Sequence, residues 1–158
     1  MATVACMEGH APAGGCILGL TCDERVMASG KIGLNETALG LAPPWWICDL
    51  LCRVVGEAKG EQMLQRGTLL DPAGAAAVGL IHTAVDTPAE LMPAAEKAMR
   101  AMLAIPDPAR QLVKAMRRAP IGDGMRGRVE ADADFFVACI TNPGVQHAIT
   151  TYVNSLKK

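Results

Sequence analysis

The chain has 158 residues and a formal net charge of −1, and 51% of its residues are hydrophobic while 20% are charged. These values exclude a disordered chain and give no basic footprint for nucleic-acid binding. Alanine occupies 26 positions and aromatic residues only 3%, which favours closely packed helices over a sandwich or barrel. The length fits one domain.

Two features concern location. The longest stretch without Asp, Glu, Lys or Arg, residues 135–156, contains Asn142, Pro143 and Gly144, which are unfavourable in lipid. Met1 is followed by Ala-Thr-Val rather than by a basic leader. We therefore expect no membrane span and find no targeting signal in this chain.

The first half of the chain alternates short apolar strands with one helix. The helix is expected from Gly14, after a turn at residues 11–13. Ser29-Gly30 is expected to join two of the strands. The expected strands are Val4–Met7, Arg25–Ala28, Lys31–Gly33 and Leu80–Val85.

After residue 70, four helix starts are marked by a capping side chain followed by proline at the first helical position. They are Asp71-Pro72, Thr87-Pro88, Asp107-Pro108 and Asn142-Pro143. Apolar residues then recur at helical spacing in residues 91–102, 112–116 and 145–156. The order predicts an α/β layer followed by a helical section.

The six cysteines contain no C-x-x-C pair and lie in apolar stretches. Cys48 and Cys52 are spaced to share a helix face, but zinc needs two more ligands and no histidine has metal spacing. We expect free thiols in a reducing compartment and no metal site. Cys16, at a helix start, is either an activated thiolate or, as we favour, a buried inert thiol.

Gly14 and Gly15 open the expected helix. Paired glycines there let a ligand approach backbone amides that point toward negative charge. The dinucleotide fingerprint G-x-G-x-x-G fails because position 16 is Cys. The alternative is that both glycines only permit close packing of the helix on a strand.

Glu36 is a lone carboxylate in the largely apolar segment Gly33–Gly40. Desolvation there would raise its pKa, as a general base working near neutral pH requires. The pattern alone favours a simpler interpretation, a surface glutamate that caps the next turn.

A basic row lies opposite the apolar residues Leu112, Val113 and Met116 on one predicted helix. It could bind phosphates, but we favour the solvated face of an amphipathic helix. The row consists of Arg110, Lys114, Arg117 and Arg118.

Residues 5–16, Thr21-Cys22-Asp23 and Ile32–Thr37 together resemble the enoyl-CoA hydratase/isomerase (crotonase) superfamily. Residues 73–85 and 105–116 extend the resemblance over nearly the whole chain. The Gly-Leu-Asn-Glu-Thr element is similar to the mitochondrial Δ3,Δ2-enoyl-CoA isomerase branch. The implied fold is an α/β, ClpP/crotonase-type ββα spiral that lacks its first repeats, with active-site loops in residues 1–104. Residues 105–158 would form a helical trimerisation region.

The resemblance also implies a chemistry. The thioester oxygen would lie in a hole of two backbone amides, one from Gly14 beside Gly15. Glu36 would carry a proton from C2 to C4, and Asn35 would line the acyl pocket, whose depth depends on the loop Pro43–Trp46. A hydratase uses a second carboxylate where this chain has Ile17, so isomerisation of 3-enoyl-CoA in β-oxidation of unsaturated fatty acids is expected rather than hydration. No cofactor is implied, because CoA is part of the substrate.

In this family a preceding segment supplies the second oxyanion amide and much of the CoA adenine pocket. We expect little or no activity from this chain without it, because losing one oxyanion donor costs about 10²–10³ in rate. The alternative is a weak or inactive subunit that binds CoA thioesters or only oligomerises.

The resemblance further implies a mitochondrial matrix location and a homotrimer. The apolar stripes of the last helices would lie in the subunit interface, or else pack on the chain's own sheet. Lys157 is a candidate contact for a CoA phosphate.

Overall fold

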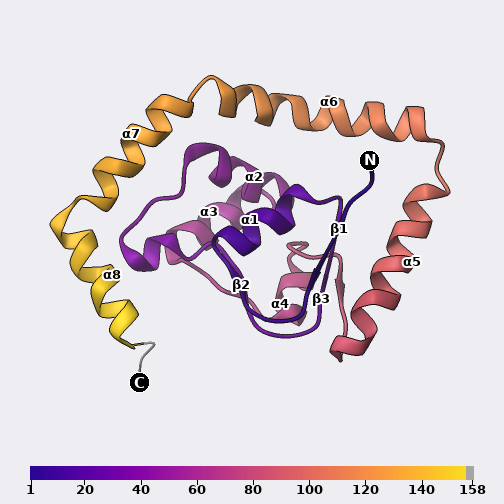
Figure 1. Ribbon diagram of the computed structural model, residues 1–158, viewed down its shortest axis with the longest axis horizontal. Helices are drawn as coiled ribbons and strands as arrows, with labels where there is room; N and C mark the ends of the chain where they lie inside the picture. The colour runs from indigo at the N-terminus through magenta and orange to yellow at the C-terminus, as the bar shows by residue number, and fades with distance from the viewer. Residues whose placement is uncertain (156–158) are drawn as a thin grey trace.

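In the computed structural model, which describes residues 1–155, an α/β core is partly encircled by an arc of helices (Figure 1). Leu156, expected in the last apolar stripe, and Lys157, expected at a phosphate, lie outside the described residues.

The core contains two small parallel sheets. Strands β1 (Val4–Met7), β3 (Glu24–Met27) and β5 (Thr83–Ala84) form the first, in the order β1-β3-β5. Strands β2 (Ala11–Pro12) and β4 (Ile32–Gly33) form the second. Helix α1 (Gly14–Thr21) follows β2 and provides the crossover that parallel strands require.

Further helices surround these sheets. The 3₁₀ helix η1 (Glu36–Leu39) precedes α2 (Trp45–Val55), α3 (Glu57–Arg66) and α4 (Pro72–Ala77). After β5 come η2 (Pro88–Glu90) and α5 (Leu91–Leu103). Helices α6 (Asp107–Arg126), α7 (Val129–Ile140) and α8 (Pro143–Ser155) complete the arc.

Two adjacent residues of β3 show how the core is divided. Val26 packs with Leu91 and Ala95 of α5, whereas Met27 belongs to a larger cluster with residues of α1 to α4. Successive side chains of a strand point to opposite faces, so the first sheet lies between these two apolar layers. The predicted α/β layer is confirmed, as is the inward apolar stripe of α5.

The two strands expected on either side of Ser29-Gly30 are present as β3 and β4, but they do not pair with each other. β3 and β4 belong to different sheets, and the segment between them passes against the loop that joins β1 to β2. Ser29 donates a hydrogen bond to the Glu8 carbonyl, and a Cβ on Gly30 would lie 2.5 Å from the His10 nitrogen. The two connections therefore leave the first sheet together and enter the second together.

Two other expectations change. The strand expected over residues 80–85 shrinks to β5, because the amides of Leu80 and Ile81 both donate to the Ala75 carbonyl of α4 rather than to a neighbouring strand. Trp45 and Trp46, expected in a loop, begin α2, whose buried residues Ile47 and Leu51 have helical spacing.

Three of the four predicted caps are confirmed. The Asp71 and Asn142 side chains accept hydrogen bonds from backbone amides of their helices, and Thr87 forms a capping box with Glu90. The cap predicted at Asp107 is wrong by one residue, because Pro106 occupies the cap position and Asp107 is the first residue of α6. The Asp107 carboxylate pairs with Arg110 instead.

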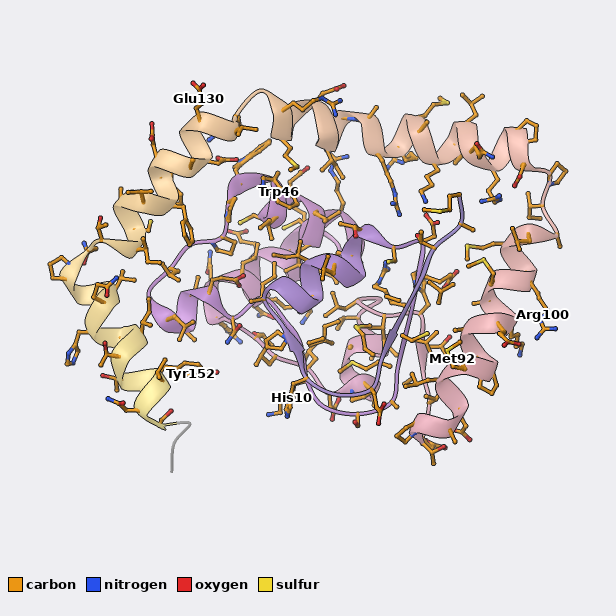
Figure 2. All side chains as sticks on the ribbon, in the orientation of Figure 1. His10, Trp46, Met92, Arg100, Glu130 and Tyr152 are labelled. Carbon is orange, nitrogen blue, oxygen red and sulfur yellow. The ribbon has the colours of Figure 1, made fainter. Side chains whose placement is uncertain are left out.

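Helices α6, α7 and α8 contain no fully buried residue over residues 107–155. Leu112, Val113 and Met116 are 61–65% exposed, so the alternative expectation that they pack on the chain's own sheet is wrong. Figure 2 shows Glu130 pointing away from the core and Trp46 lying between the core and the arc. Within the part that the structure describes, no helix is both long and apolar enough to cross a membrane.

Candidate active site

The second sheet brings the predicted site residues to one edge. Its register pairs Ala11 with Ile32 and Pro12 with Gly33 in parallel, and the Ala13 amide donates to the Gly33 carbonyl at 2.9 Å. Because the strands are parallel, both leave the sheet at the same end. Gly14 follows one strand there, and Asn35 and Glu36 follow the other.

Strand β4 is also held on its other side. Ile32 and Leu70 exchange two backbone hydrogen bonds of 2.9 Å each. Gly33 has φ +151°, and a Cβ there would lie 2.2 Å from the Thr68 carbonyl oxygen, so only glycine fits. The segment that carries Glu36 therefore starts from a fixed strand.

The start of α1 presents unpaired backbone donors. The Ala13 carbonyl accepts the first intrahelical bond, from Ile17 at 3.0 Å, and Ala13 provides no side-chain cap. The amides of Gly14, Gly15 and Cys16 therefore have no carbonyl partner within the helix. Ala13 itself has φ +48° and ψ −113°, a backbone conformation that costs energy for a residue with a Cβ.

The packing interpretation explains one glycine of the pair. A Cβ on Gly15 would lie 3.2 Å from the Ala11 Cβ, so Gly15 permits close approach of α1 to β2. A Cβ on Gly14 would meet nothing within 4 Å. Packing of a side chain therefore does not explain the glycine at position 14.

Glu36 is half-buried at the first position of η1. Its Oε2 atom is sealed from water and has no hydrogen-bond partner among residues 1–155. Burial raises the pKa of this carboxyl group above its usual value. Glu36 is therefore not a fully exposed surface residue, and one of its two carboxylate oxygens is desolvated.

Asn35 is only 8% exposed and occupies the cap position of η1. Asparagine at such a position normally accepts a hydrogen bond from the helix, but this side chain does not.

The neighbours of Glu36 on α1 are apolar in character. Burial, with a smaller contribution from the Glu36 charge, raises the pKa of the Cys16 thiol to about 12. An activated thiolate is thus excluded, and the inert thiol is confirmed. Ile17 is partly buried and packs on the core, so no carboxylate stands at that position.

A cavity of about 270 Å³ lies between the start of α2 and helix α7. Burial, and to a smaller extent the Glu36 charge, raises the pKa of Cys48, which lines this cavity. The Arg128 guanidinium lies 5.6 Å from the Trp45 ring centroid. The lining residues are Pro43, Trp45, Cys48, Arg128, Asp132 and Phe135. Local sequence pattern gives no sign of it, because its halves are 80 residues apart.

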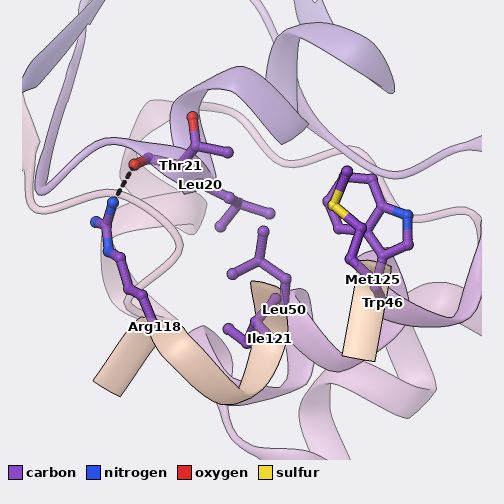
Figure 3. Close-up of a pocket in the computed structure, with 7 residues that line it drawn as sticks. All are labelled: Leu20, Thr21, Trp46, Leu50, Arg118, Ile121 and Met125. Atoms are coloured by element: carbon purple, nitrogen blue, oxygen red, sulfur yellow. Dashed lines mark hydrogen bonds between the residues drawn. The ribbon is translucent and has the colours of Figure 1, made fainter. Parts of the chain in front are cut away.

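Two members of the basic row of α6 contact the core, while Arg117 is exposed and Arg110 pairs with Asp107 of the same helix. Lys114 and Arg118 both contact the Asp23 carboxylate, so a solvated face is the wrong interpretation for these two residues. Figure 3 shows Arg118 bonded to the Thr21 carbonyl at the edge of an apolar cavity of about 160 Å³. The other residues that line it are Leu20, Trp46 and Leu50 from the core and Ile121 and Met125 from α6.

Residues 1–155 bring no three or more His, Cys, Asp or Glu side chains together as a metal site would need.

Comparison with known proteins shows what the chain resembles. The family described as enoyl-CoA hydratase/isomerase matches residues 1–158. Mitochondrial enoyl-CoA delta isomerase 1 of Mus musculus is 38% identical over all of this chain and 55% of its own length. The Homo sapiens protein of the same name is 38% identical over 98% of this chain and 52% of its own.

A solved structure gives the same result. The crystal structure of human mitochondrial delta3-delta2-enoyl-CoA isomerase superimposes with a TM-score of 0.87, covering 94% of this chain and 58% of that one. The chain thus spans about half the length of the curated relatives it matches.

Proposed function

Because the chain belongs to the enoyl-CoA hydratase/isomerase family, we propose that it binds acyl-CoA thioesters and moves the double bond of a 3-enoyl-CoA to the trans-2 position. One observation carries the proposal. The half-buried carboxylate of Glu36 and the unpaired amide of Gly14 follow paired parallel strands at one sheet edge.

The reaction is a proton shift with a single base. The Glu36 carboxylate removes a proton from C2, and the electrons move to the thioester oxygen, where the Gly14 N–H stabilises the negative charge. Glutamic acid at 36 then returns the proton to C4, the double bond forms between C2 and C3, and the carboxylate is restored. A raised pKa suits this role, because the group must both take and release a proton near neutral pH.

Ile17 supports isomerisation rather than hydration. Addition of water to a 2-enoyl-CoA needs a group that holds and deprotonates the water, and an isoleucine side chain can do neither. A 1,3-proton shift needs no such second group. The reaction requires no cofactor, since CoA belongs to the substrate.

The acyl chain is proposed to extend into the cavity between α2 and α7. Pro43, Trp45 and Phe135 of its lining suit a hydrocarbon chain, and Arg128 and Asp132 give it a polar side. The substrate would then be held partly by the arc of helices.

Two further properties are proposed from the relatives. These relatives are named as mitochondrial enzymes, which supports the same location and a role in β-oxidation of unsaturated fatty acids. The outward apolar residues of α6 support self-association, for which we propose a homotrimer.

A weak or inactive subunit that binds CoA thioesters or only oligomerises is the second candidate. The exposed apolar side chains of α6 would suit such an oligomer-forming subunit. In this case thioester binding or self-association is present without conversion.

The test is the conversion of a 3-enoyl-CoA by the full chain, followed by the absorbance of the conjugated thioester. We expect slow conversion by the wild type and loss of at least about 10²-fold in Glu36→Gln, which keeps shape but cannot accept the proton. Cys16→Ser is the matched control, since its buried thiol has no part in the reaction. Equal rates for wild type and Glu36→Gln, or a 3-hydroxyacyl product, would refute the isomerase.

A further inference from the structure

We infer that Thr37 is a positioning residue for the proposed base: its hydroxyl holds the 3₁₀ helix η1 against helix α3, and this contact keeps the Glu36 carboxylate in its half-buried place. The inference rests on the proposed function for its meaning in the reaction. It gives a role to a side chain that acts only through its neighbour.

Helix η1 has little else to hold it. It contains no fully buried residue. The backbone hydrogen bonds at its end are local, from amides in residues 38–41 to carbonyls in residues 35–37. Among residues 1–155, the Thr37 hydroxyl makes the only hydrogen bond from η1 to another helix or strand, to the Leu64 carbonyl at 2.7 Å.

The carbonyl that Thr37 reaches belongs to a fixed support. Leu64 lies in the last turn of α3, where carbonyls have no acceptor role left within the helix, and it also accepts the Gly67 amide at 3.2 Å. Met63, the residue before it, is 3% exposed, and Leu64 itself packs on the core. The bond therefore ties η1 to a helix that the core holds in place.

The two elements are also in close contact. Gly67 ends α3 with φ +57°, and a Cβ there would lie 3.0 Å from Thr37 Oγ1 and 3.1 Å from the Ala38 nitrogen. Glycine at position 67 thus lets η1 approach the end of α3. A side chain there would push η1 outward, so a second residue controls the same contact.

Thr37 and Glu36 face different neighbours. Successive residues of a 3₁₀ helix lie about 120° apart around its axis. Thr37 faces α3, whereas the Glu36 charge contributes to the raised pKa of Cys16 on α1 and of Cys48 on α2. Fixing the Thr37 side of η1 therefore sets how deeply the carboxylate lies on the other side.

The pKa of Glu36 reports this depth. Burial raises the pKa and the residue's own backbone amide lowers it less, with no charged side chain of residues 1–155 among the causes. The thiols that feel Glu36, Cys16 and Cys48, have raised pKa values and are uncharged near neutral pH. If η1 moves outward, the carboxyl group gains water and its pKa falls toward the usual value.

The experiment compares Thr37→Val, which keeps the shape of the side chain without its hydroxyl, with Thr37→Ser, which keeps the hydroxyl. The full chain is isotope-labelled at its glutamate carboxyl groups and titrated by NMR, and the Glu36 signal is the one absent in Glu36→Gln. We expect Thr37→Val to lower the Glu36 pKa toward its usual value and Thr37→Ser to leave it raised. Gly67→Ala, which displaces η1 without changing Thr37, should lower it as well.

Kinetics provide the second measurement. Thr37→Val should lower kcat for a 3-enoyl-CoA about ten- to a hundredfold with little change in KM, because a slightly misplaced base still allows substrate to bind. The acid limb of the pH profile of kcat should move to lower pH together with the Glu36 pKa. Thr37→Ser should retain most of the wild-type kcat.

Thr141→Val is the matched control. The Thr141 hydroxyl donates to the Val137 carbonyl at the same distance of 2.7 Å, but this bond lies within α7 and its turn. Its loss should leave the Glu36 pKa and kcat unchanged. A common effect of removing any threonine hydroxyl is thereby separated from the effect at position 37.

Three results would overturn the inference and leave the proposed function intact. They are equal Glu36 pKa values in wild type, Thr37→Val and Gly67→Ala; a lower melting temperature in Thr37→Val with unchanged pKa and kcat; and a Thr37→Ser variant that behaves like Thr37→Val. If Thr37→Val does not fold, the Glu36 pKa in Gly67→Ala decides. Absence of conversion by the wild type would refute the proposed function, whereas the NMR titration would still show whether Thr37 sets the depth of Glu36.

Discussion

The Nζ atom of Lys114 lies 2.7 Å from Oδ2 of Asp23, although the two residues are 91 positions apart in the chain. Arg118 approaches the other carboxylate oxygen at 2.9 Å, and the Thr3 amide donates to Oδ2 at 2.9 Å. One carboxylate therefore connects the start of β1, the turn between α1 and β3, and helix α6. The arc of helices is held to the core by charge at this point.

Asp23→Asn should loosen that attachment. The amide keeps the size of the side chain but loses the charge that two cations share, so we expect a loss of about 1–3 kcal/mol in unfolding free energy. Thermal unfolding should show a decrease of several degrees in Tm. Asp123→Asn removes an exposed pair with Arg126 and is the control. Equal effects of the two substitutions would contradict the role of Asp23.

The same pair predicts a pH dependence. Burial alone would raise the pKa of Asp23, but hydrogen bonds from Lys114 and Thr3 and the charge of Arg118 outweigh it and lower the pKa below 3.8. A lowered pKa stabilises the fold above the usual pKa, and this contribution is lost as the pH falls through the lowered value. The Tm difference between wild type and Asp23→Asn should therefore be full at pH 7 and shrink below about pH 4.

Glu36→Gln should make the protein more stable while removing its activity. Burial raises the pKa of Glu36 above 4.5, so the folded state favours the protonated form and loses stability as the pH rises through the raised pKa. We expect equal Tm values for the two proteins near pH 4 and a higher Tm for Glu36→Gln, by a few degrees, at pH 7. A lower Tm for the variant at pH 7 would show that the carboxylate has a partner that stabilises it.

Ile17→Glu should add hydration. A carboxylate one turn into α1 gives the site a second group that can hold and deprotonate water, so hydration of trans-2-enoyl-CoA should rise about tenfold over Ile17→Gln, its uncharged match. Both variants should lose about 1–3 kcal/mol of stability, because Ile17 packs on the core. Efficient hydration by the wild type would overturn the assignment to isomerisation.

Leu112→Glu combined with Met116→Glu should break self-association. Both side chains are more than 60% exposed, so the chain should still fold, and sedimentation should detect any change in mass. Loss of two buried side chains from an interface should weaken association by at least about 100-fold. Lys97→Glu on α5 controls for the added negative charge. If the double variant and the wild type show the same mass at all concentrations, α6 is not in the interface.

Local pattern predicted much of this fold. The caps at Asp71, Thr87 and Asn142 depend only on residues that are near each other in sequence. The strand Val4–Met7 and the helix that begins at Gly14 were predicted from local sequence in the same way. The strands on either side of Ser29-Gly30 were predicted, but their placement in two different sheets was not, because pairing depends on distant segments. The same holds for the basic row of α6, whose partner Asp23 precedes it by 91 residues.

The sequence likewise predicted only part of the candidate site. Gly14 and Glu36 were found from their residue types and the family resemblance, but the pattern around Glu36 favoured a surface position. Its burial depends on η1 lying against α3 and the α3–α4 turn, which periodicity does not reveal. Neither the unpartnered amide of Asn35 nor the cavity lined by α7 has any signature in local sequence.

The close contact between the two loops at Gly30 has a consequence for mutational tolerance. Position 30 lies outside the proposed site, on a surface turn where most substitutions would be expected to be neutral. Any side chain at position 30 would collide with the β1–β2 loop and displace it from the segment between β3 and β4. Strands β2 and β4, which follow these two connections, would then shift relative to each other. A variant at this glycine would therefore behave like an active-site variant, although Gly14 and Glu36 themselves are unchanged.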